Sequence, residues 1–438
     1  MDTTITAVHG RRIWDSRGRP TVEVDVHLAC GAAGRGAAPA GASRGSREAV
    51  DLRDGGARLG GFDVSGALAG INGEIARSLL ERDGADQPAI DRTLIVLDGT
   101  PDKSRLGGNA LIAASLAVLS AAAAAHSVPL WRHLAGETQV RLPLPEIQIF
   151  GGGAHAGRRV DVQDFMIMPL AAKSFGEGLE MVAEVYRAAG SRLREKGQLF
   201  GVADEGGYWP AFANNEEALA LLVVAIEDAG FVPGTDIGIS LDIAASELRR
   251  DGTYRLALDE RELDSAQMVA LMLGWLRRYP IVSIEDPLAE DDIDGWRQMM
   301  SAIESLGRPL QVIGDDLLVT SARQVDAAAA RGLCNAVLIK PNQAGTVTET
   351  KAALDAGRRA GFATIVSARS GETEDAVIAH LAVGWNAGQL KVGSFARSER
   401  MAKWNEVIRI EEAMGAGARF AGGDALFGSR TGPKENQV

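Results

Sequence analysis

A short apolar run that ends in charged residues, followed by a helical pattern, recurs along the second part of the chain. Six such runs close on ionisable side chains, namely Asp242, Glu285, Asp315, Lys340, Arg369 and Lys391. Amphipathic or alanine-rich segments such as 321–332 and 348–361 lie between the runs. Strands that alternate with helices of this length indicate a parallel sheet. With at least two elements before them, six strands are enough to close a (β/α)8 barrel.

The placement of the charges favours a barrel over an open sheet. In a βα-barrel the carboxyl ends of the strands form the mouth where active sites lie. An open doubly wound sheet also binds ligands at that edge, but at one switch point rather than around a ring. The residues before about 140 read differently, with two strand-like runs in 4–30 and a glycine-rich loop at 39–56. We therefore predict an α+β domain over 1–140 and a barrel over 141–438.

Composition excludes several classes of protein. The 438 residues carry a formal net charge of −12, which argues against general nucleic-acid binding. The two cysteines, Cys30 and Cys334, form no CxxC motif and fit reduced thiols in a cytoplasmic protein. The N-terminus has no apolar segment typical of a signal peptide. The apolar run 109–130 is rich in alanine and ends near a proline, so we predict a buried helix rather than a membrane span.

Three carboxylates are expected to meet at the mouth of the barrel. Asp242, Glu285 and Asp315 end three successive strands. One such residue alone is more often a helix cap or a surface group, but three that converge repel one another unless a cation lies between them. Hard oxygen ligands without nearby histidine or cysteine suit Mg²⁺. The pattern predicts a magnesium site.

The following strands bring positive charge to the same edge. Lys340, Arg369 and Lys391 indicate an anionic substrate, and Arg369 with Ser370 has the chemistry of an oxyanion clamp. A single lysine is usually a surface residue, but surface lysines rarely end apolar strands. Lysines held among cations can be tuned toward the neutral amine and act as general bases. Metal ions can then stabilise an enediolate, an arrangement known from the enolase superfamily.

Two glycine-rich segments offer further polar groups. The stretch "VADEGGYWP" places Asp204 and Glu205 in a predicted mouth loop. The stretch "GGGAHAGRRVDVQDFMIMP" offers His155, Gln163 and Asp164. A histidine on a glycine loop is weak evidence alone, but in this company it indicates a contact to a phosphate or a leaving group.

With these residues in view, the chain resembles the enolase (phosphopyruvate hydratase) family along nearly its whole length. The matching stretches, in order, include "DSRGRPTVEVDV", "GASRGSREA", "FMIMP", "DEGG", "YPIVSIEDPLAEDD", "GDDLLVT", "LIKPNQAGT", "RSGETED" and "ARSERMAKWNEVIRIEE". The resemblance implies an N-terminal α+β capping domain and an enolase-type (β/α)8 barrel. Because "DSRGRPTVEV" and "RIEE" resemble stretches of the family's dimer interface, it also implies a homodimer or higher homo-oligomer.

The resemblance assigns roles position by position. Asp242, Glu285 and Asp315 match the ligands of a first Mg²⁺, and Ser43 matches the ligand of a second Mg²⁺ that arrives with substrate. Lys340 matches the base that removes the C2 proton. Lys391 matches the lysine that binds the substrate carboxylate. Glu205 matches the acid that helps the C3 hydroxyl leave, and Asp164 matches its carboxylate partner. The remaining matches are contacts to the substrate and its phosphate, namely His155, Gln163, Arg369 and Ser370.

The departures from the family pattern lie around the reacting groups. Ala368 stands where the family has a histidine that contacts the phosphate. Asp164 stands where the family has glutamate, and a misplacement of about 1 Å can cost on the order of 10²-fold in rate. The glycine loop loses two polar groups, and Tyr208 and Trp209 replace a smaller pair. Metal ligands and both lysines are unchanged.

Three functions follow from these observations. The interpretation that we favour from the sequence is a specialised paralogue that acts on a phosphate or phosphonate analogue of 2-phosphoglycerate, similar to the carboxyphosphonoenolpyruvate synthase branch of phosphonate antibiotic biosynthesis. The alternative is a glycolytic enolase that converts 2-phosphoglycerate to phosphoenolpyruvate. A non-catalytic enolase-like binding protein is the third, against which the intact lysines and metal ligands count.

Overall fold

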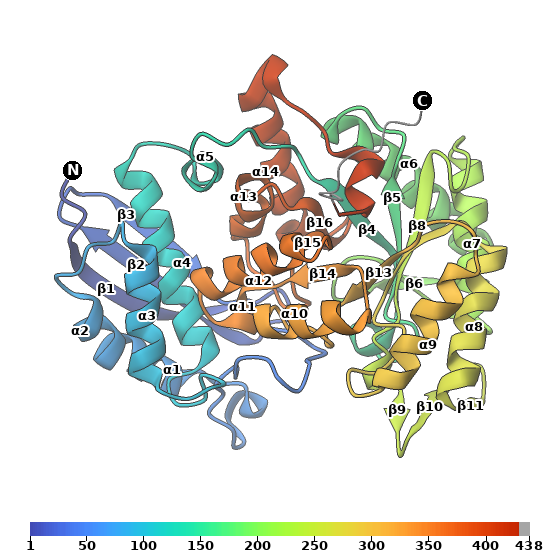
Figure 1. The fold of residues 1–438 in the computed structure, drawn as a ribbon, viewed down its shortest axis with the longest axis horizontal. Helices are drawn as coiled ribbons and strands as arrows, with labels where there is room; N and C mark the ends of the chain where they lie inside the picture. The colour runs from blue at the N-terminus through green and yellow to red at the C-terminus, as the bar shows by residue number, and fades with distance from the viewer. Residues whose placement is uncertain (429–438) are drawn as a thin grey trace.

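The computed structural model describes residues 1–428 and contains an N-terminal sheet with helices beside a closed barrel (Figure 1). The N-terminal part is an antiparallel sheet of β1 (Ile5–Trp14), β2 (Pro20–Leu28) and β3 (Ala33–Ala37). Its helices are α1 (Ser65–Gly70), α2 (Ala76–Leu79), α3 (Gln87–Asp98), α4 (Gly108–Ala125) and α5 (Leu130–Ala135). The division of the chain at residue 140 stays a prediction.

Helix α4 is the centre of the N-terminal core. It is long and apolar enough to cross a membrane by length and composition, but 89% of its apolar window is buried inside the structure. It packs against β2 and β3. A Cβ on Gly34 would lie 2.0 Å from the backbone nitrogen of Ala121, so only glycine lets β3 approach the helix this closely. Helix α4 is a core helix, as the sequence predicts.

Eight strands form the barrel, in the order in which they pair. They are β4 (Leu144–Gly151), β5 (Asp164–Pro169), β8 (Ile237–Asp242), β12 (Ile281–Glu285), β13 (Gln311–Gly314), β14 (Ala336–Ile339), β15 (Ala363–Ser367) and β16 (Gly388–Ser394). Pairing of β16 with β4 closes the ring, so no edge is left open. The predicted barrel with an N-terminal α+β domain is confirmed.

The six strands predicted from their charged ends pair in parallel, but one strand that precedes them is reversed. Strand β5 runs antiparallel to both of its neighbours, β4 and β8. The connection 152–163 contains only a short 3-10 turn (Gly153–Ala156) and no helix of the kind that usually carries the chain back for a parallel strand. Two helices, α6 (Phe175–Glu195) and α7 (Asn215–Asp228), with the hairpin β6 (Leu199–Val202) and β7 (Tyr208–Pro210) between them, then lead to β8.

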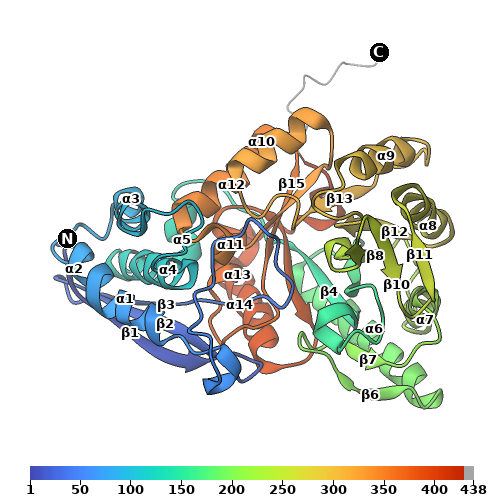
Figure 2. The same cartoon turned by 90° about the horizontal axis from the view of Figure 1, so that it is seen from below.

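The remaining helices cover the outside of the barrel (Figure 2). They are α8 (Ser265–Arg278), α9 (Ile293–Glu304), α10 (Ala322–Arg331), α12 (Val347–Arg359), α13 (Val377–Gly384) and α14 (Ser398–Met414). The single turn α11 (Pro341–Ala344) instead follows Lys340 at the mouth and packs against α4. A small antiparallel sheet, β9 (Arg249–Arg250), β10 (Thr253–Leu256) and β11 (Arg261–Leu263), follows β8. Figure 2 also shows the segment between β3 and α1 reaching from the N-terminal sheet across to the barrel.

Candidate active site

One small cavity, of about 20 Å³, lies where the strands of the barrel converge on the segment after β3. Most of the residues predicted for the site line it: Ser43, His155, Gln163, Asp164, Glu205, Asp242, Lys340, Ala368, Arg369, Ser370 and Lys391. The other two, Glu285 and Asp315, do not line the cavity but contact its lysines. The structure therefore brings the predicted site together from both parts of the chain.

Lys391 joins two of the predicted metal ligands. Its Nζ donates hydrogen bonds to Asp242 Oδ2 at 2.9 Å and to Glu285 Oε2 at 2.8 Å, and lies 3.6 Å from Asp164 Oδ2. Asp242 and Glu285 are register partners on β8 and β12. Burial alone would lower the pKa of Lys391, but Asp242, Glu285 and Asp164 outweigh it and raise that pKa well above its usual value.

Lys340 forms an equivalent pair with the third predicted metal ligand. Its Nζ donates to Asp315 Oδ2, and its backbone N–H donates to Thr320 Oγ1 at 2.9 Å. Burial would lower the pKa of Lys340, yet Asp315 outweighs burial and the pKa is raised. The expectation that neighbouring cations tune these lysines toward the neutral amine is therefore wrong for the side chains alone, because each lysine lies against a carboxylate.

The acids nevertheless fit a divalent cation. Asp242, Glu285 and Asp315 are all buried, and burial with the charge of Asp242 raises the pKa of Glu285 well above its usual value. Glu285 Oε1 is buried and has no hydrogen-bond partner among residues 1–428. Buried carboxylates that repel one another and keep a free oxygen are a donor set that suits Mg²⁺.

A neighbouring carboxylate that sequence reasoning did not assign supports the third ligand. Asp286 accepts the backbone N–H groups of Asp315 at 2.9 Å and Asp316 at 2.8 Å. The oxygens of Asp286, Asp315 and Asp316 form one of two buried acidic groups with metal-ligand spacing in the described part of the chain. Asp286 could have been identified from the sequence because an acid pair lies at the end of each of β12 and β13, namely Glu285–Asp286 and Asp315–Asp316.

The second such group is His155, Asp164 and Glu205. His155 Nδ1 lies 3.7 Å from both Asp164 Oδ1 and Glu205 Oε1. Burial would lower the pKa of His155, but Glu205 and Asp164 outweigh it and raise that pKa. Asp164 has a pKa lowered to about 2, because His155 and Lys391 outweigh the effect of burial. His155 thus lies between two carboxylates that favour its protonated form.

Gln148 on β4 fixes the shorter Asp164, and the sequence pattern did not identify it. Its amide nitrogen donates to Asp164 Oδ1, while its amide oxygen accepts the N–H of Gly207 at 2.8 Å. Gln163, which precedes Asp164 in the chain, donates from its amide nitrogen to Asp242 Oδ2 at 3.0 Å. The amide groups therefore hold the carboxylates of β5 and β8 in place.

Arg369 is held by a carboxylate from the N-terminal part. Its guanidinium pairs with Glu48 at 2.9 Å and donates to the backbone oxygen of Ser43 at 2.9 Å and to Asn342 Oδ1 at 3.1 Å. Ser370 Oγ accepts a hydrogen bond from Arg17 at 3.2 Å. Glu48 was not singled out from the sequence, although it belongs to the quoted "GASRGSREA" stretch.

Ala368 lines the cavity and is 6% exposed. Its backbone N–H donates to the backbone oxygen of Lys391 at 2.9 Å. A cavity of about 20 Å³ has room for about one water molecule. Ala368 therefore offers the cavity a methyl group and no polar side-chain atom.

Comparison with known proteins agrees with this geometry. The model of the enolase C-terminal TIM barrel domain matches residues 139–427, and that of the enolase N-terminal domain matches residues 5–134. A relative named Enolase 1, from Desulfitobacterium hafniense (strain Y51), is 50% identical over 419 residues, which cover 95% of each chain.

Proposed function

Since this chain belongs to the enolase family, we propose that it dehydrates 2-phosphoglycerate to phosphoenolpyruvate as a magnesium-dependent lyase. The observation that carries the proposal is the pair of buried lysines, Lys340 and Lys391, each against carboxylates of neighbouring strands at one cavity. The identity of 50% to Enolase 1 over nearly the whole chain supports this activity rather than the phosphonate-transfer activity that the departures suggested.

Lys340 is the proposed base that takes the C2 proton. It must first be deprotonated, and its ion pair with Asp315 opposes that step. Asp242, Glu285 and Asp315 would hold the first Mg²⁺, and Ser43 would contribute to a second. Bound magnesium would stabilise the negative charge that develops on the substrate carboxylate when the C2 proton is removed. The same positive charge would offset the carboxylates next to Lys340 and Lys391 and so lower the pKa of both lysines. Lys391 would then orient the substrate carboxylate.

Glu205 is the proposed acid for the hydroxyl that leaves from C3. His155 lies 3.7 Å from it and from Asp164, so the histidine and the two acids form one group between which a proton can be exchanged. Asp164, held by Gln148, would keep His155 in this orientation. The proton for the leaving hydroxyl would thus come from the group of acids and histidine on one side of the cavity.

Arg369, Ser370 and Gln163, with His155, are proposed to contact the substrate and its phosphate. Arg369 is pre-oriented by Glu48, and a planar guanidinium offers the paired donors that phosphate accepts. Ala368 would border the phosphate without a polar contact. A cytoplasmic location, a homodimer or higher oligomer and a small phosphorylated substrate complete the proposal.

The test is direct. Purified protein is incubated with Mg²⁺ and 2-phosphoglycerate, and phosphoenolpyruvate is measured with and without a phosphonoformyl donor. We expect rapid formation of phosphoenolpyruvate that does not depend on the donor, and its loss in a Lys340→Ala variant. Slow turnover alone, with a new phosphorus-containing product when the donor is present, would instead establish the phosphonate paralogue.

A further inference from the structure

We propose that Glu290 is a positioning residue that latches the segment 41–48, here called the Ser43 loop, over the mouth of the barrel. The inference rests on the proposed function in so far as Ser43 takes part in the reaction. Glu290 lies on the loop that follows β12, outside the catalytic cavity, and none of the roles assigned above includes it.

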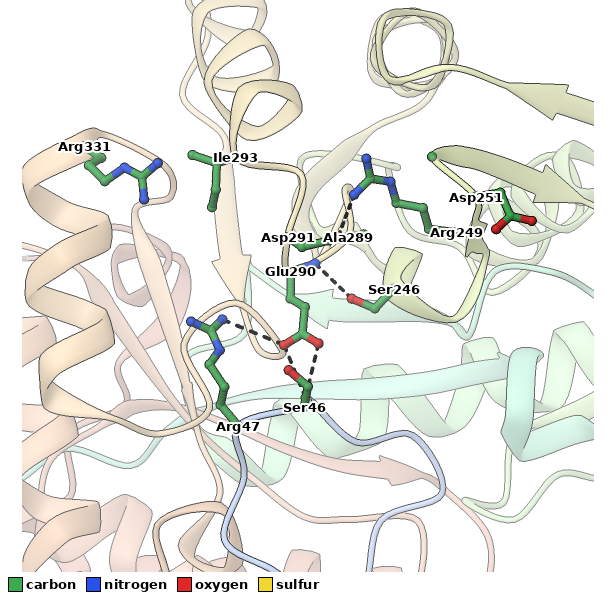
Figure 3. Close-up of a pocket in the computed structure, with 11 residues that line it drawn as sticks. Ser46, Arg47, Ser246, Arg249, Asp251, Ala289, Glu290, Asp291, Ile293 and Arg331 are labelled. Atoms are coloured by element: carbon green, nitrogen blue, oxygen red, sulfur yellow. Dashed lines mark hydrogen bonds and ion pairs between the residues drawn. The ribbon is translucent and has the colours of Figure 1, made fainter. Parts of the chain in front are cut away.

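The contacts between Glu290 and the loop tip carry the proposal. The backbone N–H of Ser46 lies 3.2 Å from both carboxylate oxygens of Glu290. The guanidinium of Arg47 lies 3.8 Å from Glu290 Oε2 and donates to the backbone oxygen of Leu317 at 3.0 Å. Figure 3 shows the carboxylate of Glu290 between Ser46 and Arg47. One side chain thus accepts the backbone N–H of Ser46 and lies within ion-pair distance of Arg47.

Glu290 is itself attached to a rigid part of the barrel. Its backbone N–H donates to Ser246 Oγ at 3.0 Å. Two residues later, Asp292 caps α9 and accepts hydrogen bonds from Tyr254 and Ser265, both at 2.6 Å. Because these contacts already fix the loop that carries Glu290, little binding free energy is spent on ordering it when the carboxylate binds the Ser43 loop.

The two ends of the Ser43 loop are held differently from its tip. Arg369 binds the backbone oxygen of Ser43, and Glu48 accepts the N–H of Gly45 at 3.0 Å while it pairs with Arg369. On its inner side, the loop lines the catalytic cavity with Ser43. On its outer side, Ser46 and Arg47 border an open cleft of about 810 Å³ (Figure 3).

The position of Glu290 predicts its effect on the reaction. Between Ser43 and Glu48, the side chains of Arg44, Ser46 and Arg47 are exposed and only Gly45 is buried, so few side chains of the tip pack against the barrel. If substrate binds only when the Ser43 loop is closed, the apparent affinity for substrate falls in proportion to the fraction of molecules in which the loop is closed. Loss of Glu290 should therefore raise KM more than it lowers kcat.

The experiment compares three variants of the full-length protein. Glu290→Ala removes the latch, Glu290→Gln keeps an acceptor for Ser46 but not the charge for Arg47, and Asp291→Asn is the matched control. Asp291 borders the same cleft but pairs with Arg249 at 2.6 Å instead of with the loop. We expect KM for 2-phosphoglycerate and for Mg²⁺ to rise on the order of tenfold in Glu290→Ala, less in Glu290→Gln and not in Asp291→Asn.

A second measurement does not require activity. Limited trypsin digestion with mass spectrometry measures the rate of cleavage after Arg44 and Arg47, and we expect faster cleavage in Glu290→Ala than in wild type or Asp291→Asn. Equal cleavage rates and an unchanged KM would overturn the latch. If the wild type does not convert 2-phosphoglycerate but cleavage is faster in Glu290→Ala, the proposed function fails and the latch stands.

Discussion

Lys391 Nζ and Glu285 Oε2, 2.8 Å apart, join β16 to β12 inside the mouth of the barrel. Both residues are buried, and the same amino group also binds Asp242. The lysine therefore compensates more than one buried carboxylate, and the stability of the mouth depends on it.

We expect Lys391→Met to lower the free energy of unfolding by about 3–5 kcal/mol, because removal of one partner leaves buried charge uncompensated. Urea unfolding in the presence of a chelator measures the change. Added Mg²⁺ should stabilise the variant more than the wild type. Lys351→Met, which breaks a half-exposed pair with Asp355, is the control and should change stability by less than about 1 kcal/mol. Equal effects of the two substitutions would contradict the interpretation.

Gly41→Ala tests the fit between the Ser43 loop and Arg369. A Cβ at position 41 would lie 1.9 Å from a guanidinium nitrogen of Arg369 and 2.8 Å from the backbone oxygen of Ser43. Arg369 or the loop must therefore shift, and a shift of about 1 Å can cost on the order of 10²-fold in kcat/KM. Gly73→Ala, where a Cβ meets nothing within 4 Å, should leave kcat/KM unchanged. Steady-state kinetics on 2-phosphoglycerate compares the two.

Ala368→His tests whether the alanine leaves usable space. Because Ala368 is buried beside a cavity of about 20 Å³, an imidazole overpacks the closed site. We expect a loss of about 1–3 kcal/mol in the free energy of unfolding. Ala368→Ser adds only a hydroxyl and should cost less. If Ala368→His is as stable as wild type and binds 2-phosphoglycerate more tightly, the site has room that the closed cavity does not contain.

The pair His126 and His133 predicts a dependence of stability on pH. Their rings stack with centroids 5.4 Å apart at the end of α4 and in α5. Burial, and then the charge of His126, lowers the pKa of His133. The unfolded chain therefore binds a proton at a higher pH than the folded protein, so stability is lost as pH falls through the ordinary histidine value of about 6.5. In urea unfolding between pH 8 and pH 5, His133→Gln should lose less stability than wild type.

The barrel could be predicted from the sequence because its signal is local. Each apolar run with a charged end predicts one strand and the direction in which it runs. Six such strands that alternate with helices are compatible with few architectures other than a barrel. The reversed β5 could not be predicted in this way, because its direction depends on the structure of the connection 152–163 rather than on the residues of β5 itself.

Site residues such as Asp242 and Lys340 could be predicted because each is an ionisable residue at the end of an apolar strand. Gln148, Glu48 and Asp286 were missed because their importance depends on what they contact. Glu48 is typical: its carboxylate matters only because the fold places it 2.9 Å from Arg369, which is 321 residues away in the chain. Long-range pairs of this kind are not encoded in any local pattern.

The reversed direction of β5 has a consequence for how the site can vary. Asp164 is the first residue of β5, and the strand leads away from the mouth toward Pro169 at the opposite end of the barrel. Elsewhere in the barrel, a side chain at the mouth is followed at once by the loop that it helps to shape. At position 164 the chain goes directly into the core instead. The register of β5 with β8 is set by backbone pairing from Asp164 to Pro169, so the length of this one acidic side chain can change while the strand behind it stays in place.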